Sequence, residues 1–345
     1  MATIRDIGEF GFINRIAEKG LTREEDVVCG IGDDCAVLPL DAHRVLLLTT
    51  DLMVEDVHFR LGATSPQDLG YKLLAVNLSD VAAMGGDPRE AVVSVAAPTD
   101  LDLAHLDGLY DGLHECAERF RTNIVGGDTT RSPGPLVLNL ALTGEASSDC
   151  VLTRSGARPG DLVYASGTLG DSAGGLALVL GEEAQIHRAA REHLLRRHHR
   201  PEPRVELGKR LAASGAVTAM IDLSDGVASD LQHICERSEV SAVVEEARVP
   251  LSPPLRGFCR STGTDPMAPA LSGGEDYELL FTADPGRADK LDRIAAATDV
   301  PPLHRIGEIG EGPANVCLIS STGERRELSA TGFDHFGSDQ QQGID

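Results

Sequence analysis

The sequence predicts a mixed α/β fold in two domains, and three observations support this prediction. The chain has 345 residues, about twice the length of an ordinary single domain. Its hydrophobic fraction of 41% and its charged fraction of 25% are typical of globular proteins. Short apolar segments of strand length also alternate with helical patterns along both halves of the chain.

The first domain is expected over residues 1–150. An amphipathic helix is predicted over residues 8–20, because its apolar residues share one face. A long helix is predicted from Pro66, since proline is tolerated in a first helical turn, to Met84, which precedes two glycines. The other predicted elements are a helix over 103–120 and strands over 27–29, 36–38, 45–50, 91–97, 123–125 and 136–143.

The second domain is expected over residues 151–336, with the boundary just before a turn-rich segment at 155–161. Phe336 is the last apolar residue, so residues 337–345 are expected to form a solvent-exposed tail. The predicted helices lie at 172–180, 204–213 and 227–237, and the predicted strands at 162–166, 217–221, 242–244, 278–282 and 316–319.

Four histidines gather in an arginine-rich segment of the second domain: His187, His193, His198 and His199. No cysteine or acidic residue accompanies them at the spacing of a metal site. The segment is therefore predicted to be a solvent-exposed helix and turn.

The chain is strongly acidic. It has 31 Lys and Arg against 54 Asp and Glu, which gives a formal net charge of −23. This charge repels the phosphate backbone of nucleic acids and the surface of anionic membranes, so neither is an expected partner. Small phosphorylated ligands remain open, because divalent cations bridge carboxylates to phosphates.

The protein is expected to be cytoplasmic and to have no membrane segment. The longest apolar runs, such as residues 45–48, are only as long as a strand. Arg5, Asp6 and Glu9 lie where a secretory signal would need apolar residues. The seven cysteines are scattered and form no C-x-x-C pair, as expected for reduced thiols.

Three aspartates follow predicted strands. Asp51 comes after the strand at 45–50, Asp128 after 123–125 and two glycines, and Asp222 after 217–221. Ligands of α/β sheets bind beyond the carboxyl ends of the strands, so the three aspartates mark a candidate site. Any one of them alone is also explained by ordinary turn chemistry.

Further carboxylates suggest a metal. Asp33 and Asp34 are adjacent behind two glycines, and two carboxylates about 4 Å apart repel by roughly 4 kcal/mol at an effective dielectric of 20. Asp80 lies among apolar residues of the long helix, where a carboxylate needs a partner. Mg²⁺ would serve both, whereas an exposed Asp-Asp turn and a capped or exposed Asp80 remain alternatives.

The segment Asp222–Gly226 precedes a predicted helix, where it can cap the helix, present free N–H groups to an anion, or do both. The phosphate-binding G-x-x-x-x-G-K-[ST] motif, G-x-G-x-x-G, G-x-S-x-G and the kinase catalytic-loop motif do not occur.

Together these segments resemble the thiamine-monophosphate kinase family, within the superfamily of aminoimidazole ribonucleotide synthetase. The matching segments run in order along nearly the whole chain, and as a set they are specific. They are GEF at 8–10, GIGDD at 30–34, TTD at 49–51, VHF at 57–59, AVNLSDVAAMG at 75–85, GGDT at 126–129, TRSGA at 153–157, DLSDG at 222–226, SGGEDYEL at 272–279 and GFDHF at 332–336.

The resemblance implies the reaction ATP plus thiamine monophosphate giving ADP plus thiamine diphosphate, assisted by several Mg²⁺ ions. It implies thiamine-phosphate contacts at His58, Glu275 and Phe333. It implies nucleotide contacts at Tyr110, Gly127, Asp128, Arg154 and Ser224. It implies metal ligands at Asp34, Thr49, Thr50, Asp51, Asp80, Asp128, Asp222 and Asp225.

The resemblance also implies a two-domain α/β fold that dimerises through its N-terminal domain. One departure from the family pattern is Asp56, at a position where the family usually has glycine. The replacement of glycine by Asp56 affects the expected conformation of the loop between Asp51 and His58, but not the expected roles of these two residues.

The residues themselves agree with a metal-assisted transfer. A phosphate monoester has a second pKa of about 6, so at neutral pH it is largely ionised and needs no general base. The obstacle is repulsion between two polyanions, which Mg²⁺ held by Asp51, Asp80 and Asp128 would reduce. Arg154 would add donors to phosphate oxygens, and direct transfer without a phosphoenzyme is expected.

Three other interpretations remain open for these residues. Another ATP-dependent enzyme of the same superfamily is the first. A metal-dependent phosphohydrolase would also use clustered aspartates, but it would release free phosphate without a second substrate. A non-catalytic acidic metal-binding protein is the third, and the position of aspartates after successive strands argues against it.

Overall fold

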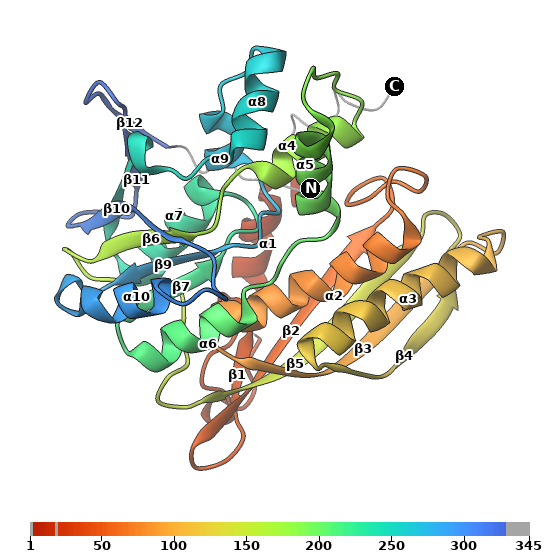
Figure 1. The fold of residues 1–345 in the computed structure, drawn as a ribbon. Helices are drawn as coiled ribbons and strands as arrows, with labels where there is room; N and C mark the ends of the chain where they lie inside the picture. The colour runs from red at the N-terminus through yellow and green to blue at the C-terminus, as the bar shows by residue number, and fades with distance from the viewer. Residues whose placement is uncertain (1–2, 18–19, 329–345) are drawn as a thin grey trace.

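The computed structural model describes residues 3–17 and 20–328, which form two sheets with helices packed against them (Figure 1). The predicted mixed α/β fold is thus confirmed. Phe333, Phe336 and the tail at 337–345 lie outside the described residues.

Among the described residues, the N-terminal sheet has five strands in the order β1 (Ala36–Pro39), β2 (Arg44–Val54), β5 (Val137–Ser147), β3 (Asp87–Ala97) and β4 (Asn123–Arg131). Only β3 and β4 pair in parallel, and the other pairs are antiparallel. Helices α2 (Pro66–Ala83) and α3 (Leu103–Phe120) cover one face of this sheet (Figure 1). The other face carries exposed apolar side chains, including Leu48, Leu52 and Val92.

Helix α2 forms where the sequence predicts it. The Ser65 hydroxyl accepts a hydrogen bond from the Asp68 N–H at 3.1 Å, and Pro66 occupies the first turn. Almost every residue from Leu69 to Ala83 is buried, because the helix lies between the N-terminal sheet, α3, α6 (Val205–Ser214) and β7 (Val217–Asp222). Helix α2 therefore connects the two halves of the molecule.

The second sheet has seven described strands in the order β12 (Arg325–Glu327), β11 (Val316–Ile319), β8 (Ser241–Glu245), β10 (Leu303–Gly310), β6 (Leu162–Ser166), β9 (Leu279–Ala283) and β7. Helix α7 (Val227–Ser238) packs on several of these strands. A separate layer contains α4 (Asp171–Val179), α5 (Arg188–His199) and α8 (Pro253–Thr262). Two further helices are α9 (Met267–Ser272) and α10 (Ala288–Ala295). Short 3₁₀ turns lie at Ile4–Asp6, Glu24–Asp26, Glu246–Arg248 and Pro285–Arg287.

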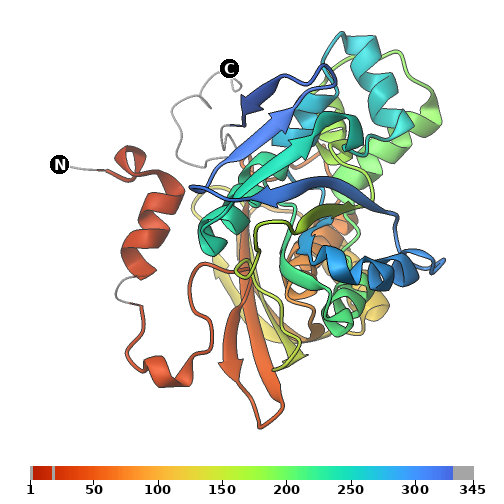
Figure 2. The same cartoon turned by 90° about the vertical axis from the view of Figure 1, so that its left-hand side faces the viewer.

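Helix α1 (Gly8–Ala17) lies at the edge of the molecule, apart from both sheets (Figure 2). Its predicted apolar face is not covered by the described residues, since the side chains of Phe12 and Ile16 are both 43% exposed.

Several predicted boundaries are wrong. Strand β2 continues to Val54 and β4 to Arg131, so Asp51 and Asp128 lie within strands and not after them. The predicted strand at 27–29 is only an isolated bridge between Cys29 and Val37. Of the three aspartates placed after strands, only Asp222 lies at a strand end.

The histidine segment is also corrected. It forms helix α5, but its last turn is not solvent-exposed, because Arg197 and His198 are 8% and 5% exposed. Both side chains face carboxylates of the segment before β9: Arg197 bonds to Glu278, and His198 to Glu275. None of the helices in the described part of the chain combines the length and the apolar character of a transmembrane span.

Candidate functional site

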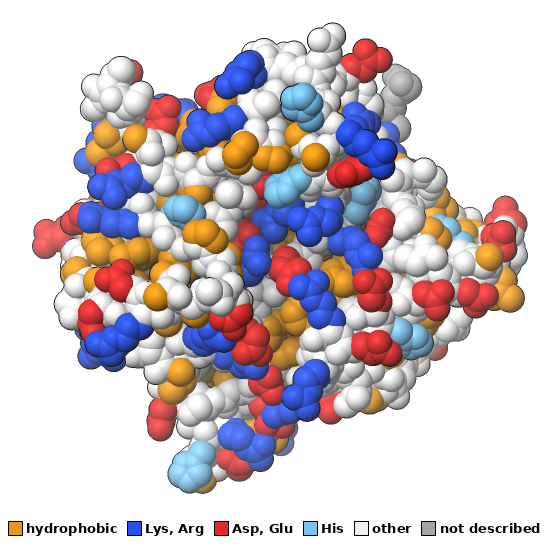
Figure 3. Space-filling view, viewed as in Figure 1, with side chains coloured by type: hydrophobic (Ala, Val, Ile, Leu, Met, Phe, Trp, Pro, Cys, Tyr) orange, Lys and Arg blue, Asp and Glu red, His pale blue; other side chains and the backbone are white. Residues whose placement is uncertain are grey.

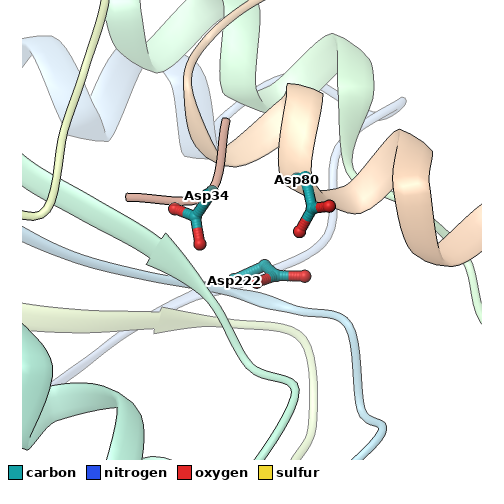
Figure 4. A group of neighbouring side chains, drawn as sticks. All are labelled: Asp34, Asp80 and Asp222. Atoms are coloured by element: carbon teal, nitrogen blue, oxygen red, sulfur yellow. The ribbon is translucent and has the colours of Figure 1, made fainter. Parts of the chain in front are cut away.

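Three aspartates from distant parts of the chain meet between the two sheets. Asp34 precedes β1, Asp80 lies on α2, and Asp222 is the last residue of β7. One carboxylate oxygen from each lies within 4.8 Å of the others, and the side chains point toward a common centre (Figure 4). This spacing is suited to a single cation bound by oxygen ligands.

Neighbouring side chains hold these carboxylates in place. Thr49 donates to Asp80 at 2.5 Å, and Ser79 donates to Asp222 at 2.6 Å. Because Thr49 lies on β2 and Ser79 on α2, the group is oriented by rigid elements rather than by loops alone.

The site concentrates buried negative charge. Burial raises the pKa of Asp51 to about 6. Burial and the charge of Asp34 raise the pKa of Asp222 to about 8, and the same two causes raise the pKa of Asp33 to about 7. Burial, followed by the charges of Asp51 and Asp222, also raises the pKa of Asp80. Each carboxylate thus resists ionisation unless a cation is present.

Two carboxylate oxygens in and beside this group of aspartates lack a hydrogen-bond partner. Among the described residues, Oδ2 of Asp34 and Oδ2 of Asp51 are buried and accept no hydrogen bond. Buried carboxylate oxygens are costly to leave unpaired, and hard divalent cations such as Mg²⁺ prefer such oxygens. The residues present therefore fit a divalent metal.

A divalent cation is expected to bind to this acidic site more tightly at pH 8 than at pH 6. The raised pKa values of Asp51, Asp33 and Asp222 mean that protons compete for the carboxylates in this interval. We expect the rise in melting temperature caused by Mg²⁺ to be larger at pH 8, with proton release seen by calorimetry in buffers of different ionisation enthalpy. A Mg²⁺ effect that is equal at both pH values would contradict the assignment.

Arg154 provides the cationic side of the site. Its guanidinium donates to Asp34 at 2.5 Å, and its backbone N–H donates to Asp33 at 3.1 Å. The sequence predicts this residue as a phosphate contact. In the structure it lies on the acidic group and has one buried nitrogen, Nε, that donates to no described residue.

The end of β7 places the other predicted residues of this segment nearby. Ser224 and Asp225 follow Asp222 and are half-buried at the start of α7. The side chain of Asp230 accepts hydrogen bonds from the N–H groups of Asp225 and Gly226, which fixes the turn.

Asp128 and Thr50 are not brought to this group within one chain. Asp128 pairs with Ser94 of β3, which pairs with Asn139 of β5, which pairs with Leu52 of β2. Paired residues of neighbouring strands share a face, so Asp128 lies on the open face, three strands from β2. Thr50 is on the same face of β2, opposite to Thr49 and Asp51.

The predicted nucleotide contacts Gly127 and Tyr110 are on separate elements. A side chain on Gly127 would lie 1.8 Å from the carbonyl oxygen of Val93, so only glycine allows this close approach of β4 to β3. Tyr110 lies on α3, partly buried against the N-terminal core, with its ring 6.2 Å from that of His114.

The predicted acceptor contacts lie on two loops. His58 follows β2 and accepts a hydrogen bond from the Val54 N–H at 3.0 Å through Nδ1. Asp56, in the same loop, has a φ of 63°, which explains why a family would prefer glycine there and why aspartate, tolerant of this region, replaces it. Glu275 precedes β9, and Phe333 lies outside the described residues.

Sequence reasoning missed the partners of Glu275 and Glu278. Lys72 on α2 contacts Glu275, and Arg197 and Arg204 contact Glu278. The available signal is a single lysine in the apolar run of α2, which is the same kind of signal as Asp80.

A cavity of about 470 Å³ opens at the junction of the two halves, on the face shown in Figure 3, where basic side chains gather. Its basic residues face carboxylates: Arg119 faces Glu202, and Lys209 faces Asp87. The three aspartates do not line this cavity.

Comparison with known proteins gives a consistent assignment. Residues 32–146 match the N-terminal domain of AIR synthase related proteins, and residues 158–319 match the C-terminal domain. Thiamine-monophosphate kinase from Escherichia coli K12 is 40% identical over 96% of this chain and 99% of its own length. The Bacillus subtilis protein of the same name is 36% identical over 95% and 99%.

Solved structures agree. The structure of AaThiL complexed with AMPPCP and TMP is 33% identical and has a TM-score of 0.85, covering 97% of this chain and 99% of that one. A structure of the hydrogenase maturation protein HypE with ATP, at 23% identity and a TM-score of 0.68, shows only the shared fold. The chain therefore belongs to the thiamine-monophosphate kinases, a family of enzymes among the AIR synthase related proteins.

Proposed function

We propose that this protein transfers the γ-phosphoryl group of ATP to the phosphate of thiamine monophosphate, giving ADP and thiamine diphosphate, the last step in making that cofactor. The observation that carries the proposal is the meeting of Asp34, Asp80 and Asp222 beside Arg154. The relatives' name and the AaThiL complex with an ATP analogue and TMP support it.

The acidic group would hold Mg²⁺, with Asp34, Thr49, Asp51, Asp80 and Asp222 as ligands from one chain. When bound, Mg²⁺ neutralises phosphate charge and stabilises the charge that develops on the transferred group. We also propose Thr50, Asp128 and Asp225 as ligands, because their segments TTD, GGDT and DLSDG match the motifs of the family.

The Arg154 side chain would pair with the Asp34 carboxylate in the free protein and with phosphate oxygens in the complex. Its guanidinium now neutralises Asp34, and a bound cation there would release it toward phosphate oxygens, which match its planar donors. Ser224, at the start of α7, would present its N–H and hydroxyl groups to the nucleotide. Tyr110, Gly127 and Asp128 complete the proposed nucleotide contacts.

The acceptor would need no general base. Its phosphate is largely ionised at neutral pH, so the task of the site is to bring two anions into line and to exclude water. His58, Glu275 and Phe333 would hold the other end of the acceptor. The Glu275 carboxylate suits the positively charged ring of thiamine. We expect direct transfer, without a phosphorylated enzyme.

We also propose the domain division given above: a nucleotide-binding and dimerisation domain at 1–150, a second domain at 151–336 and a tail at 337–345. The two family matches, to residues 32–146 and 158–319, support a boundary near 150. All seven cysteines are free thiols, which supports the cytoplasm as the compartment.

A homodimer is proposed through the open face of the N-terminal sheet. Leu48, Leu52, Val92 and Val125 are between 40% and 60% exposed there, and a second copy would cover them. Asp128 lies on the same face, so this contact would also bring a carboxylate from one chain close to the other.

Leu52→Lys is expected to shift the protein from dimer to monomer, because it places a charge in the centre of that face. Light scattering should give about twice the chain mass of 36.5 kDa for the wild type and one chain mass for the variant. Leu180→Lys, at a side chain 55% exposed in the second half, is the matched control and should stay dimeric. A wild type of one chain mass at micromolar concentration refutes the dimer.

The proposed reaction is tested by incubating the pure protein with ATP, Mg²⁺ and thiamine monophosphate. We expect ADP and thiamine diphosphate in equal amounts by chromatography, and no product without Mg²⁺. Phosphate release from ATP without an acceptor would instead favour a phosphohydrolase. Label from the γ-phosphate on denatured protein would rule out direct transfer.

A further inference from the structure

We propose that Lys72 and His198 are positioning residues that hold the Glu275 carboxylate toward the acceptor substrate, at a distance from Asp80 fixed by helix α2. The inference rests on the proposed function and names residues that act through Glu275 rather than on the substrate itself.

The two residues contact different oxygens of one carboxylate. Nζ of Lys72 lies 2.7 Å from Oε1 of Glu275, and Nδ1 of His198 lies 3.2 Å from Oε2. The Lys72 and His198 side chains are 4% and 6% exposed, whereas the Glu275 side chain is 27% exposed. The carboxylate is therefore held from the protein side while its outer side stays open to a ligand.

The charge of this carboxylate is maintained. Burial raises the pKa of Glu275, but the charge of Lys72 and the hydrogen bond from His198 outweigh it, so the pKa falls well below the ordinary value. Burial and the charge of Lys72 lower the pKa of His198, which favours the neutral ring. Its Nδ1 lies 3.2 Å from Oε2 of Glu275 and 3.2 Å from the Ser172 hydroxyl. Lys72 is thus the one full positive charge in this contact.

The backbone around Glu275 is strained. Glu275 has a φ of 67° and Tyr277 a φ of 50°, in the left-handed region that residues other than glycine rarely adopt. Such strain persists only where surrounding contacts maintain it, and it is typical of ligand sites. Here Asp276 accepts hydrogen bonds from the N–H groups of Gly170 and Ser172 at the start of α4.

The same segment is tied to the acidic group. The Glu275 N–H donates to the carbonyl of Ser224 at 2.7 Å, and the Tyr277 N–H donates to that of Leu223 at 2.9 Å. These acceptors directly follow Asp222 in the chain. Movement of Glu275 would therefore disturb the residues beside Asp222.

Helix α2 links the two ends of the site. Lys72 and Asp80 are eight residues apart on one buried helix, which corresponds to about 12 Å along its axis. Lys72, through Glu275, thus marks the end of the site that would hold the acceptor, and Asp80 marks the end that would hold the phosphates. Both residues are on one rigid helix. A substrate with a cationic group and a phosphate at such a separation would meet both.

The alternative is that the Lys72–Glu275 pair only joins the two halves of the molecule. A double-mutant cycle followed in KM for thiamine monophosphate separates the two roles, because a pair that only joins the halves would couple in stability without changing that KM. The variants are Lys72→Met, Glu275→Gln and the pair together, and the pair leaves no uncompensated charge buried.

We expect Lys72→Met to raise KM for thiamine monophosphate about tenfold or more, with KM for ATP changed less than twofold. Glu275→Gln should raise KM similarly, and the double variant should match Glu275→Gln alone. The matched control is Lys209→Met, which breaks an ion pair between Lys209 on α6 and Asp87 on β3 and should leave both KM values unchanged. The same cycle with His198→Leu in place of Lys72→Met tests the contact between His198 and Glu275. It also replaces the first cycle if Lys72→Met does not fold.

Unchanged KM for thiamine monophosphate in Lys72→Met, or effects that add in the double variant, would overturn the inference. Calorimetric titration of thiamine monophosphate into the wild type keeps the two hypotheses apart. If the wild type does not bind it, the proposed function fails. If the wild type binds it and Lys72→Met binds equally well, only the inference fails.

Discussion

Asp80→Asn is expected to lower kcat for the proposed transfer by about 10³-fold, which corresponds to roughly 4 kcal/mol of lost transition-state stabilisation. Asparagine keeps the size of the side chain and can still accept the hydrogen bond from Thr49, but it lacks the negative charge that holds a cation. Steady-state kinetics at saturating ATP and Mg²⁺ measure the change.

The same variant is expected to be at least as stable as the wild type when no cation is present. Asp80 faces the carboxylates of Asp34 and Asp222, so removing its charge relieves repulsion. With a chelator, its melting temperature should equal or exceed that of the wild type, and Mg²⁺ should raise it less. Asp107→Asn, exposed on α3, is the control for both measurements. Near-normal activity in Asp80→Asn would remove Asp80 from the site.

Glu278→Ala is expected to lower the free energy of unfolding by about 3–5 kcal/mol, the range for breaking a buried ion pair. Glu278 is 1% exposed and accepts from Arg197 at 2.9 Å and from Nε of Arg204 at 2.7 Å. Its removal takes away the carboxylate that Arg197 and Arg204 both contact, so two largely buried guanidinium groups lose their direct ion pair.

The measurement is the urea midpoint, followed by circular dichroism and with the slope of the transition checked for a change. Glu192→Ala breaks an exposed ion pair with Arg188 on α5 and should change stability by less than about 1 kcal/mol. Equal losses in the two variants would show that the Glu278 contacts are no stronger than surface pairs.

The helices of the N-terminal half were predictable because their ends carry clear signals. Ser65 and Pro66 begin α2, and Asp102 begins α3 by accepting from the Ala104 N–H. The predicted strands are too short, because Asp51 and the two glycines before Asp128 are placed beyond the ends of their strands. Ladder hydrogen bonds with β5 and β3 override these local preferences.

The candidate site was predictable in part. The sequence identifies Asp34 by its place behind two glycines, Asp80 by its apolar neighbours on a helix, and Asp222 by its place after a strand. The position of Asp128 was not, because it depends on strand order and on which face of β4 it occupies. A change of register by one residue moves a side chain to the other face, and sequence alone does not fix the register.

The role of Lys72 shows a further limit. Its partner Glu275 is distant in the chain, and both stand on segments that meet only after the two halves pack together through α2. The burial of α5 has the same origin, because Arg197 and His198 find their carboxylate partners in that packing.

The most direct test of the account is a crystal structure of the protein with a non-hydrolysable ATP analogue and Mn²⁺, with the cation located by its anomalous scattering. The account predicts a peak about 2.1 Å from carboxylate oxygens of Asp80 and of Asp34 or Asp222. It also predicts Arg154 turned from Asp34 toward the phosphates. Bound nucleotide with no peak among these three aspartates would contradict it.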